Sequence, residues 1–165
     1  MPFTPFHFGP GILLGLFLLN KLDFPTFVAA NVIIDWRAAL VFLGFWQPPR
    51  HGWVHTYIGA ILMATLLVTV MIYLRPVIDE QLKEMKIVQE ITKKSIFLAA
   101  FSGAFLHVTI DAFHHPAMQP FMPFNVNPLL GLFSTLELRA ALLSCLIFSL
   151  PIYVFHMKDW RNISR

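Results

Sequence analysis

Long apolar runs separated by short polar segments dominate the pattern of this 165-residue chain. A helix needs about 20 mostly apolar residues to cross a hydrocarbon core of about 30 Å. Four runs approach that length and predict membrane helices over residues 25–45, 53–74, 95–115 and 136–156. A shorter run at 9–20 predicts one more helix, which either crosses the bilayer or re-enters it. The pattern therefore predicts an all-α, polytopic transmembrane helical bundle with four or five membrane helices in a single domain, 1–165.

One polar segment has a helical pattern of its own. Between Pro76 and Lys94, apolar residues recur every three or four positions among acids and lysines. They are Ile78, Leu82, Met85, Val88 and Ile91. A stripe of this kind is typical of an amphipathic helix on a membrane surface. We therefore add one amphipathic surface helix to the predicted bundle.

The composition agrees with a membrane protein. Hydrophobic residues make up 57% of the chain and charged residues 13%, whereas soluble domains carry about 25% charged residues. The single cysteine, Cys145, lies inside an apolar run, so the chain has no internal disulfide framework. We expect an integral membrane protein surrounded by membrane lipid.

Basic residues are distributed unevenly among the predicted loops. Five lie between the second and third membrane helices and three follow the last one: Arg75, Lys83, Lys86, Lys93 and Lys94, then Lys158, Arg161 and Arg165. Alternate crossings put all of them on one side, which the positive-inside rule assigns to the cytoplasm. The net charge of +3 is thus a topology signal, without the basic stripe of a nucleic-acid partner. We expect the inner (plasma) membrane of a prokaryote.

Imidazole and carboxylate side chains are concentrated in a few apolar segments. The candidate metal ligands are His7, Asp35, His51, His55, His107, Asp111 and His115. His51 and His55 are four residues apart, and His107, Asp111 and His115 continue that spacing, so each set lies on one helix face. In the predicted topology all these histidines approach the non-cytoplasmic face.

Asp35 is predicted to lie deeper in the membrane than the candidate histidines. It lies about ten residues, or about 15 Å, from the end of its predicted helix at 1.5 Å per residue. It can join the histidines only if that helix is tilted, broken or shorter than expected. A cation with imidazole ligands would offset the cost of an unpaired carboxylate in hydrocarbon.

The donor types indicate the kind of metal. Neutral imidazoles with carboxylates suit a borderline divalent ion, and the absence of thiolate ligands argues against a closed structural zinc site. We expect one or two divalent ions, Zn first, with Mn or Fe(II) as alternatives. Such an ion lowers the pKa of a bound water to about 7, as metal-dependent hydrolases require. His55 and Asp111 are the candidate catalytic residues.

Four motifs carry a resemblance to a known family, in the order Phe6-His7-Phe8-Gly9, Val32-Ile33-Ile34-Asp35, His51-Gly52-Trp53-Val54-His55-Thr56 and His107-Val108-Thr109-Ile110-Asp111-Ala112-Phe113-His114-His115-Pro116. Together they resemble the predicted membrane-bound metal-dependent hydrolases, some of which are regulated by LexA. The pattern is more distantly similar to the zinc-dependent phospholipase C and nuclease fold. The resemblance covers most of the chain and implies a hydrolytic reaction with the seven ligands given above. An acid and a proline often follow the motif aspartate, whereas this chain has Arg37 and Ala38, so no general base is expected at position 37.

Simpler roles are open to several of these residues. His51 and His55 could contact lipid headgroups, and His7 could cap the first helix. His107 and Asp111 could form an intrahelical hydrogen bond that satisfies two buried polar groups. Each of these alternatives predicts no metal.

Three more polar residues have open assignments. His114 could replace His115 as a ligand or partner of the site. Glu137 enters the last helix on the same side and could act as a base. His156 is expected at the cytoplasmic interface.

The leading hypothesis is a membrane-bound metal-dependent hydrolase that acts on an ester or phosphoester, with a lipid as a candidate substrate. The alternative is a non-catalytic metal-binding membrane subunit or scaffold that binds a protein partner. Loss of activity on chelation with the fold unchanged would favour the enzyme, whereas unfolding on chelation would favour the subunit. The pattern specifies no oligomeric state.

Overall fold

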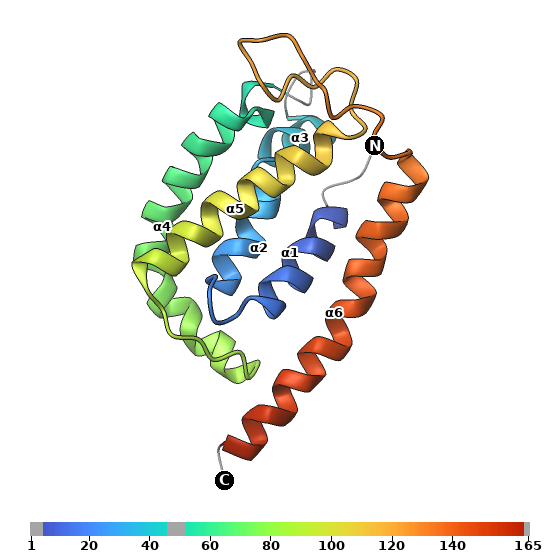
Figure 1. Cartoon of the computed structure of the whole chain (residues 1–165). Coiled ribbons are helices and arrows are strands. Elements are labelled where there is room, and N and C mark those ends of the chain that lie inside the picture. The colour runs from blue at the N-terminus through green and yellow to red at the C-terminus, as the bar shows by residue number, and fades with distance from the viewer. Residues whose placement is uncertain (1–4, 46–51, 164–165) are drawn as a thin grey trace.

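The computed structural model describes residues 5–45 and 52–163, with side chains placed for 6–45 and 52–157. Within these ranges every regular element is helical, as Figure 1 shows, which confirms the all-α class. The elements are α1 (Pro5–Phe17), α2 (Phe24–Ile33), α3 (Trp36–Phe42), a 3-10 turn η1 (Trp53–His55), α4 (Tyr57–Glu84), α5 (Lys93–Ala112) and α6 (Thr135–Ile163).

Three of the helices, α4, α5 and α6, are long and apolar enough to cross a membrane. α2 and α3 form a fourth candidate, bent by 51° at a short break, which is either a broken span or a re-entrant loop. α1 has 13 residues, about 20 Å at 1.5 Å per residue, so it is shorter than a hydrocarbon core of about 30 Å. The described helices thus support three to four spans, where four or five were expected.

The separate amphipathic helix expected over residues 76–94 is wrong. Instead α4 continues through Pro76 for two more turns. Two ion pairs at four-residue spacing link these turns: Arg75 Nη1 lies 3.3 Å from Asp79 Oδ1, and Lys83 Nζ lies 2.6 Å from Asp79 Oδ2. Pairs at this spacing stabilise a helix, and they help to offset the missing amide hydrogen of the proline.

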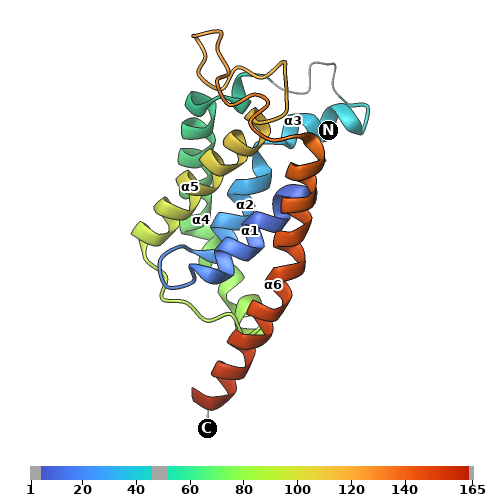
Figure 2. The ribbon, with the colours of Figure 1, turned by 45° about the vertical axis from the view of Figure 1, so that its right-hand side comes forward.

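In Figure 1 five helices follow one another in the order α4, α5, α2, α1 and α6, and each contacts its neighbours in that order. α4 also contacts α2, and Figure 2 shows α6 beside α1 at the edge of the bundle. Small residues bring α5 close to α2. A Cβ atom on Gly103 would lie 2.7 Å from Ala30 Cβ and 2.9 Å from the carbonyl oxygen of Phe27. Close backbone approach at small residues is a common way for membrane helices to pack. Here it fixes the register of α5, which carries His107 and Asp111, against α2, which ends two residues before Asp35.

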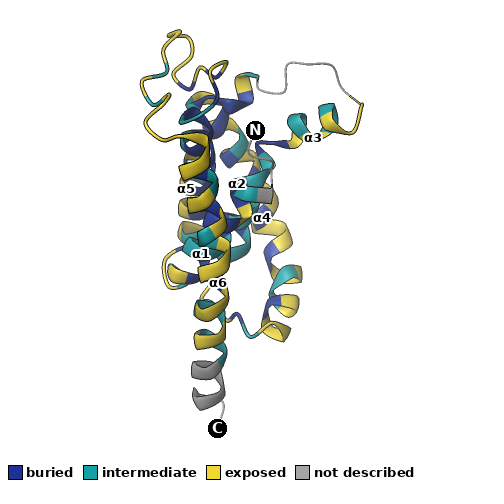
Figure 3. Ribbon diagram, turned by 90° about the vertical axis from the view of Figure 1, so that its right-hand side faces the viewer, coloured by how far each residue is buried: buried dark blue, intermediate teal, exposed yellow. Residues whose placement is uncertain are grey.

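α6 lies at the edge of the bundle, against α1. A Cβ atom on Gly9 would collide with the carbonyl oxygen of Leu142, so glycine is required where the two helices cross. Much of α6 is exposed (Figure 3), as expected for a helix that faces lipid. Further along, His156 Nε2 lies 3.1 Å from the carbonyl oxygen of Leu16.

A buried ion pair joins α4 to the turn that precedes α2. Arg75 Nε donates to Asp23 Oδ1 at 2.6 Å, and both side chains are 1% exposed. Asp23 also caps α2, because its Oδ2 atom accepts from the backbone N–H of Thr26 at 3.3 Å. Gln89 donates from Nε2 to the carbonyl oxygen of Leu22 at 2.7 Å. These bonds hold the start of α2 in place, and the polar cluster lies beyond its other end.

Candidate metal centre

Four of the seven expected ligands meet in one buried cluster, whose donor atoms all lie within 4.8 Å of one another: Asp35, His55, His107 and Asp111. His55 Nε2 lies 3.1 Å from Asp35 Oδ1 and 3.9 Å from Asp111 Oδ2. His107 Nε2 lies 3.6 Å and 3.5 Å from the same two oxygen atoms. Ligands at about 2.0–2.2 Å from one tetrahedral ion are themselves about 3.4 Å apart. The cluster could therefore bind a metal ion.

Asp35 reaches the cluster because its helix is broken. α2 ends at Ile33 and α3 begins at Trp36, so Asp35 lies at the bend between them. α3 projects away from the bundle (Figure 3). The Asp35 carboxylate makes no capping hydrogen bond to α3, and it faces His55 and His107 instead. Of the three possibilities raised by its depth in the sequence, a broken helix is the one found.

The same break orients His107. The backbone N–H of Asp35 bonds to the carbonyl of Val32 at 3.1 Å, three residues back, where a continuous α-helix would use the carbonyl of Asn31. The Asn31 carbonyl oxygen instead lies 2.7 Å from His107 Nδ1. A carbonyl can only accept, so Nδ1 carries the hydrogen, and in the neutral ring Nε2 presents its lone pair to the two carboxylates.

His55 is held by a short 3-10 turn at the start of α4. Its backbone N–H bonds to the carbonyl of Gly52 at 3.0 Å. The Thr56 hydroxyl donates to the carbonyl of Trp53 at 2.7 Å and accepts from the N–H of Gly59 at 2.9 Å. A Cβ on Gly59 would collide with the Trp53 carbonyl oxygen, so this glycine allows the turn to fold back onto the helix. These local bonds shape the turn, and the N–H of Tyr57 ties it to the carbonyl of Pro120 at 2.9 Å.

Asp111 has a second set of neighbours on its other oxygen. His7 Nε2 lies 3.1 Å and His115 Nε2 lies 3.8 Å from Asp111 Oδ1. The His7 ring stacks on the His107 ring, with centroids 4.1 Å apart and planes at 25°. His114 and His115 form a second group of possible ligands with Asp111. One carboxylate thus lies between two groups of imidazoles.

His115 and His114 lie just past the end of α5, which stops at Ala112 and not at His115 as expected. The backbone N–H of His115 still bonds to the Asp111 carbonyl at 3.1 Å, so the turn continues the helical path. Burial lowers the pKa of the His114 imidazole, which favours the neutral ring that a metal requires. Both histidines therefore remain candidates on this side of Asp111.

The electrostatics of the cluster favour a cation. Asp35 and Asp111 are 5% and 2% exposed, and two carboxylates this close repel each other where little water screens them. In the described structure no hydrogen-bond partner satisfies His107 Nε2, although it faces both of them. Buried polar atoms normally have a partner. A divalent ion between the imidazoles and carboxylates would satisfy all four groups together.

Three other residues singled out in the sequence lie outside this cluster or outside the described residues. His51 lies outside the described residues. Glu137 is exposed and caps α6: its carboxylate accepts from the N–H of Ser134 at 2.8 Å, and the Ser134 hydroxyl accepts from the N–H of Glu137 at 3.2 Å. This reciprocal pair is a capping box, so Glu137 is not a base of the cluster. The Arg37 guanidinium lies against Gly52, next to the turn that carries His55.

Sequence reasoning missed the most influential neighbour of the site. Asn31 acts through its backbone carbonyl, and a carbonyl gives no residue-specific signal. Its side chain has a different task, because Nδ2 donates to the carbonyl of Phe27 at 2.9 Å. A signal was available in Gly103 and Ala30, since small residues at corresponding positions mark close helix packing.

Comparison of the chain with protein-family models, with curated proteins and with solved structures found no match. The geometry of the cluster and its place among the membrane helices are therefore the evidence for function.

Proposed function

We propose that this protein is a membrane-bound metal-dependent hydrolase of esters or phosphoesters. One observation carries the proposal: the Asn31 carbonyl engages His107 Nδ1, which leaves Nε2 facing two buried carboxylates. Hydrogen bonding of the outer imidazole nitrogen to a carbonyl is the usual support of a metal-ligating histidine. The resemblance of the motifs to predicted membrane-bound hydrolases supports the reaction class.

The donor set supports zinc, with manganese or iron(II) as alternatives. Two imidazoles and two carboxylates form the first site, without the thiolates that close structural zinc sites. A second ion would lie on the Oδ1 side of Asp111, held by His7 and by His115 or His114. Asp111 would belong to both groups of ligands, because each of its oxygen atoms faces imidazoles.

Hydrolysis breaks the C–O or P–O bond of the ester after attack by a water oxygen on carbon or phosphorus, and the alcohol leaves with a proton. A divalent ion that takes a water in addition to the four residues of the cluster would supply Lewis acidity and lower the pKa of that water. Asp35 and Asp111 would balance its charge, and His55 would complete the ligand set. Because Asn31 fixes the ring of His107, little reorganisation is needed on binding.

The proposal places the centre at the non-cytoplasmic side of a prokaryotic inner membrane. The cluster lies where α5 ends, and the connection between α4 and α5 lies at the other end of the bundle (Figure 1). The basic residues of that connection support a cytoplasmic position for it.

The experiment is metal-dependent hydrolysis by the purified protein in nanodiscs. The substrates are p-nitrophenyl butyrate for carboxylic esters and bis(p-nitrophenyl) phosphate for phosphoesters. We expect hydrolysis of one of them, loss of activity with EDTA, and recovery on adding Zn²⁺ or Mn²⁺, with the helical circular dichroism unchanged throughout.

Asp111→Asn should remove this activity, because the amide keeps the shape of the carboxylate but loses its charge. Glu137→Gln is the matched control: it alters a carboxylate on a neighbouring helix outside the cluster. Stoichiometric metal with no hydrolysis of either ester, and unfolding on chelation, would contradict the enzyme and favour the metal-binding subunit.

A further inference from the structure

An apolar cavity of about 500 Å³, open to the surface on one side, lies along α1, between α1, α2 and α6 and next to the segment that follows α4. One face of α1 lines it with Phe8, Ile12 and Leu16, which are spaced four residues apart. The facing side of α6 contributes Leu146 and Leu150. Its volume falls within the range of about 300–1,000 Å³ that is usual for small-molecule sites.

The lining of the cavity is almost entirely apolar. Ser149 lines it, and its hydroxyl donates to the carbonyl of Leu146 in its own helix at 2.7 Å. Tyr153 lies at the far end, where its hydroxyl donates to the carbonyl of Met85 at 2.9 Å. Both hydrogens are thus already used, and a polar ligand would lose most of its hydrogen bonds there, whereas a hydrocarbon chain loses none.

The cavity begins beside the metal cluster. Phe8 directly follows His7, whose Nε2 atom lies 3.1 Å from Asp111 Oδ1. From Phe8 to Leu16 is eight residues, about 12 Å at 1.5 Å per residue. One leaflet of a hydrocarbon core of about 30 Å is about 15 Å deep. The cavity thus has about the length of a single leaflet, and Phe8 at one end of it is one residue from His7, although no residue of the cluster lines it.

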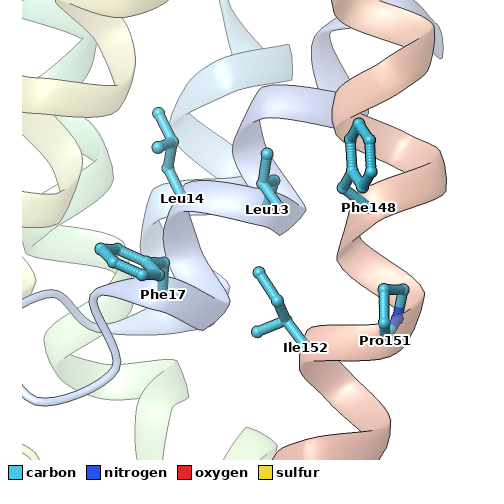
Figure 4. A pocket seen from close by; sticks show the side chains of 6 residues that line it. All are labelled: Leu13, Leu14, Phe17, Phe148, Pro151 and Ile152. Atoms are coloured by element: carbon cyan, nitrogen blue, oxygen red, sulfur yellow. The ribbon is translucent and has the colours of Figure 1, made fainter.

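A second hollow, of about 460 Å³, lies on another face of α1 and has no link to the cluster. Figure 4 shows its lining, Leu13, Leu14 and Phe17 from α1 with Phe148, Pro151 and Ile152 from α6. On α1 it starts at Leu13, six residues beyond His7, or about 9 Å. It is an internal comparison for the first cavity, equally apolar but remote from the metal.

We propose that the substrate of the metal centre is a membrane lipid, whose acyl chain lies in the cavity lined by Phe8, Ile12, Leu16, Leu146 and Leu150 while its ester or phosphoester reaches the cluster. This inference depends on the proposed hydrolase function and names its substrate class. Burial in the cavity gains little over the bilayer, because lipid tails are as apolar as the lining. The cavity therefore selects by shape and by its position beside the metal.

The test uses phosphatidylglycerol with a diazirine in the middle of one acyl chain, in nanodiscs, with light-induced adducts mapped by mass spectrometry. We expect adducts on Ile12, Leu146 and Leu150 at several times the level on Leu13 and Phe148. Leu150→Trp should fill the cavity and lower the Ile12 adducts several-fold. Ile147→Trp is the matched control, since residues 147 and 150 are 70% and 65% exposed on the same helix.

Hydrolysis of p-nitrophenyl esters supplies the second measurement. Leu150→Trp should lower the rate of hydrolysis of the decanoate ester several-fold relative to that of the butyrate ester. Ile147→Trp should leave the ratio of the two rates unchanged. Equal adducts on both faces of α1, with the butyrate ester still hydrolysed, would refute acyl-chain binding in the cavity. The proposed hydrolase function would then still stand. Cavity adducts without hydrolysis of any ester, phosphatidylglycerol included, would overturn the hydrolase and the substrate role together.

Discussion

The backbone carbonyl of Asn31 accepts a hydrogen bond from His107 Nδ1 at 2.7 Å, and this bond joins the break in one helix to a candidate metal ligand on another. The carbonyl is available because the N–H of Asp35 bonds to Val32 instead. The break at Asp35 therefore does two things at once: it delivers a carboxylate to the cluster, and it frees the acceptor that aims an imidazole at that carboxylate.

Close packing of α5 on α2 should be required for this arrangement. In Gly103→Ala the new methyl would meet Ala30 Cβ at 2.7 Å and the Phe27 carbonyl oxygen at 2.9 Å. The helices would have to separate, at a cost of about 1–3 kcal/mol, and the bond from His107 to Asn31 would lengthen. We expect a lower unfolding temperature in detergent and weaker Zn²⁺ binding by calorimetry.

Ser102→Ala is the matched control for that change. Ser102 is exposed on the same helix, and its hydroxyl donates to the carbonyl of Leu98 within that helix. It should leave metal affinity unchanged. Wild-type stability and wild-type Zn²⁺ affinity in Gly103→Ala would show that the close approach does not position the cluster.

Arg75→Met should destabilise the fold without altering the metal centre. It leaves the Asp23 carboxylate buried without its partner, and breaking a buried pair from one side costs about 3–5 kcal/mol. The remaining folded protein should hold as much metal as the wild type, since the pair lies at the other end of α2 from Asp35. The measurements are denaturant unfolding and metal content of the folded fraction.

The double variant Asp23→Asn, Arg75→Met should recover part of the lost stability, because it removes the unpaired charge. Lys83→Met is the exposed control and should change stability little. A double variant no more stable than Arg75→Met alone would mean that packing, and not the buried charge, accounts for the loss.

His7→Phe should remove one metal ion and keep the other. The phenyl ring can still stack on His107, but it offers no nitrogen to the Oδ1 side of Asp111. Inductively coupled plasma mass spectrometry should give two ions per wild-type chain and one per variant chain. His156→Phe, a change of the same kind outside the cluster, should keep two. An unchanged ion count in His7→Phe would reduce His7 to a hydrogen-bond partner of Asp111.

The topology predicts opposite sides for Gln119 and Gln81, both of which are exposed. In a Cys145→Ala background, Gln119→Cys should react with an impermeant maleimide added outside intact cells. Gln81→Cys should react only after the membrane is opened. Reaction of both cysteines from one side would refute the topology, and with it the non-cytoplasmic position of the cluster.

Much of the cluster could be predicted because its residues are rare in apolar sequence and recur at helical spacing. His107 and Asp111 share a helix face, and η1 and α4 bring His55 from a different run. Asp35 was predicted as a ligand, but no helical pattern explained how it could reach the others. The break that allows this is a backbone event, marked by neither proline nor glycine.

Element boundaries were harder to predict where tertiary contacts override local pattern. α4 passes through Pro76 because ion pairs within the helix and the buried bond from Arg75 to Asp23 support it. From the sequence, the residues after Pro76 resembled a separate surface helix. Asn31 could not be identified at all, since its contribution to the site is a main-chain oxygen.

The most direct test of the metal centre is the metal content of Asp111→Asn against the wild type after purification without chelators. The carboxylate faces imidazoles with both oxygens, so the neutral amide should lower metal content to near zero with the helical signal retained. Glu137→Gln, which alters the capping carboxylate of α6, should carry wild-type metal. A wild-type protein that binds no divalent metal even after incubation with Zn²⁺ and Mn²⁺, or an Asp111→Asn variant that binds it equally well, would contradict a metal centre at this cluster.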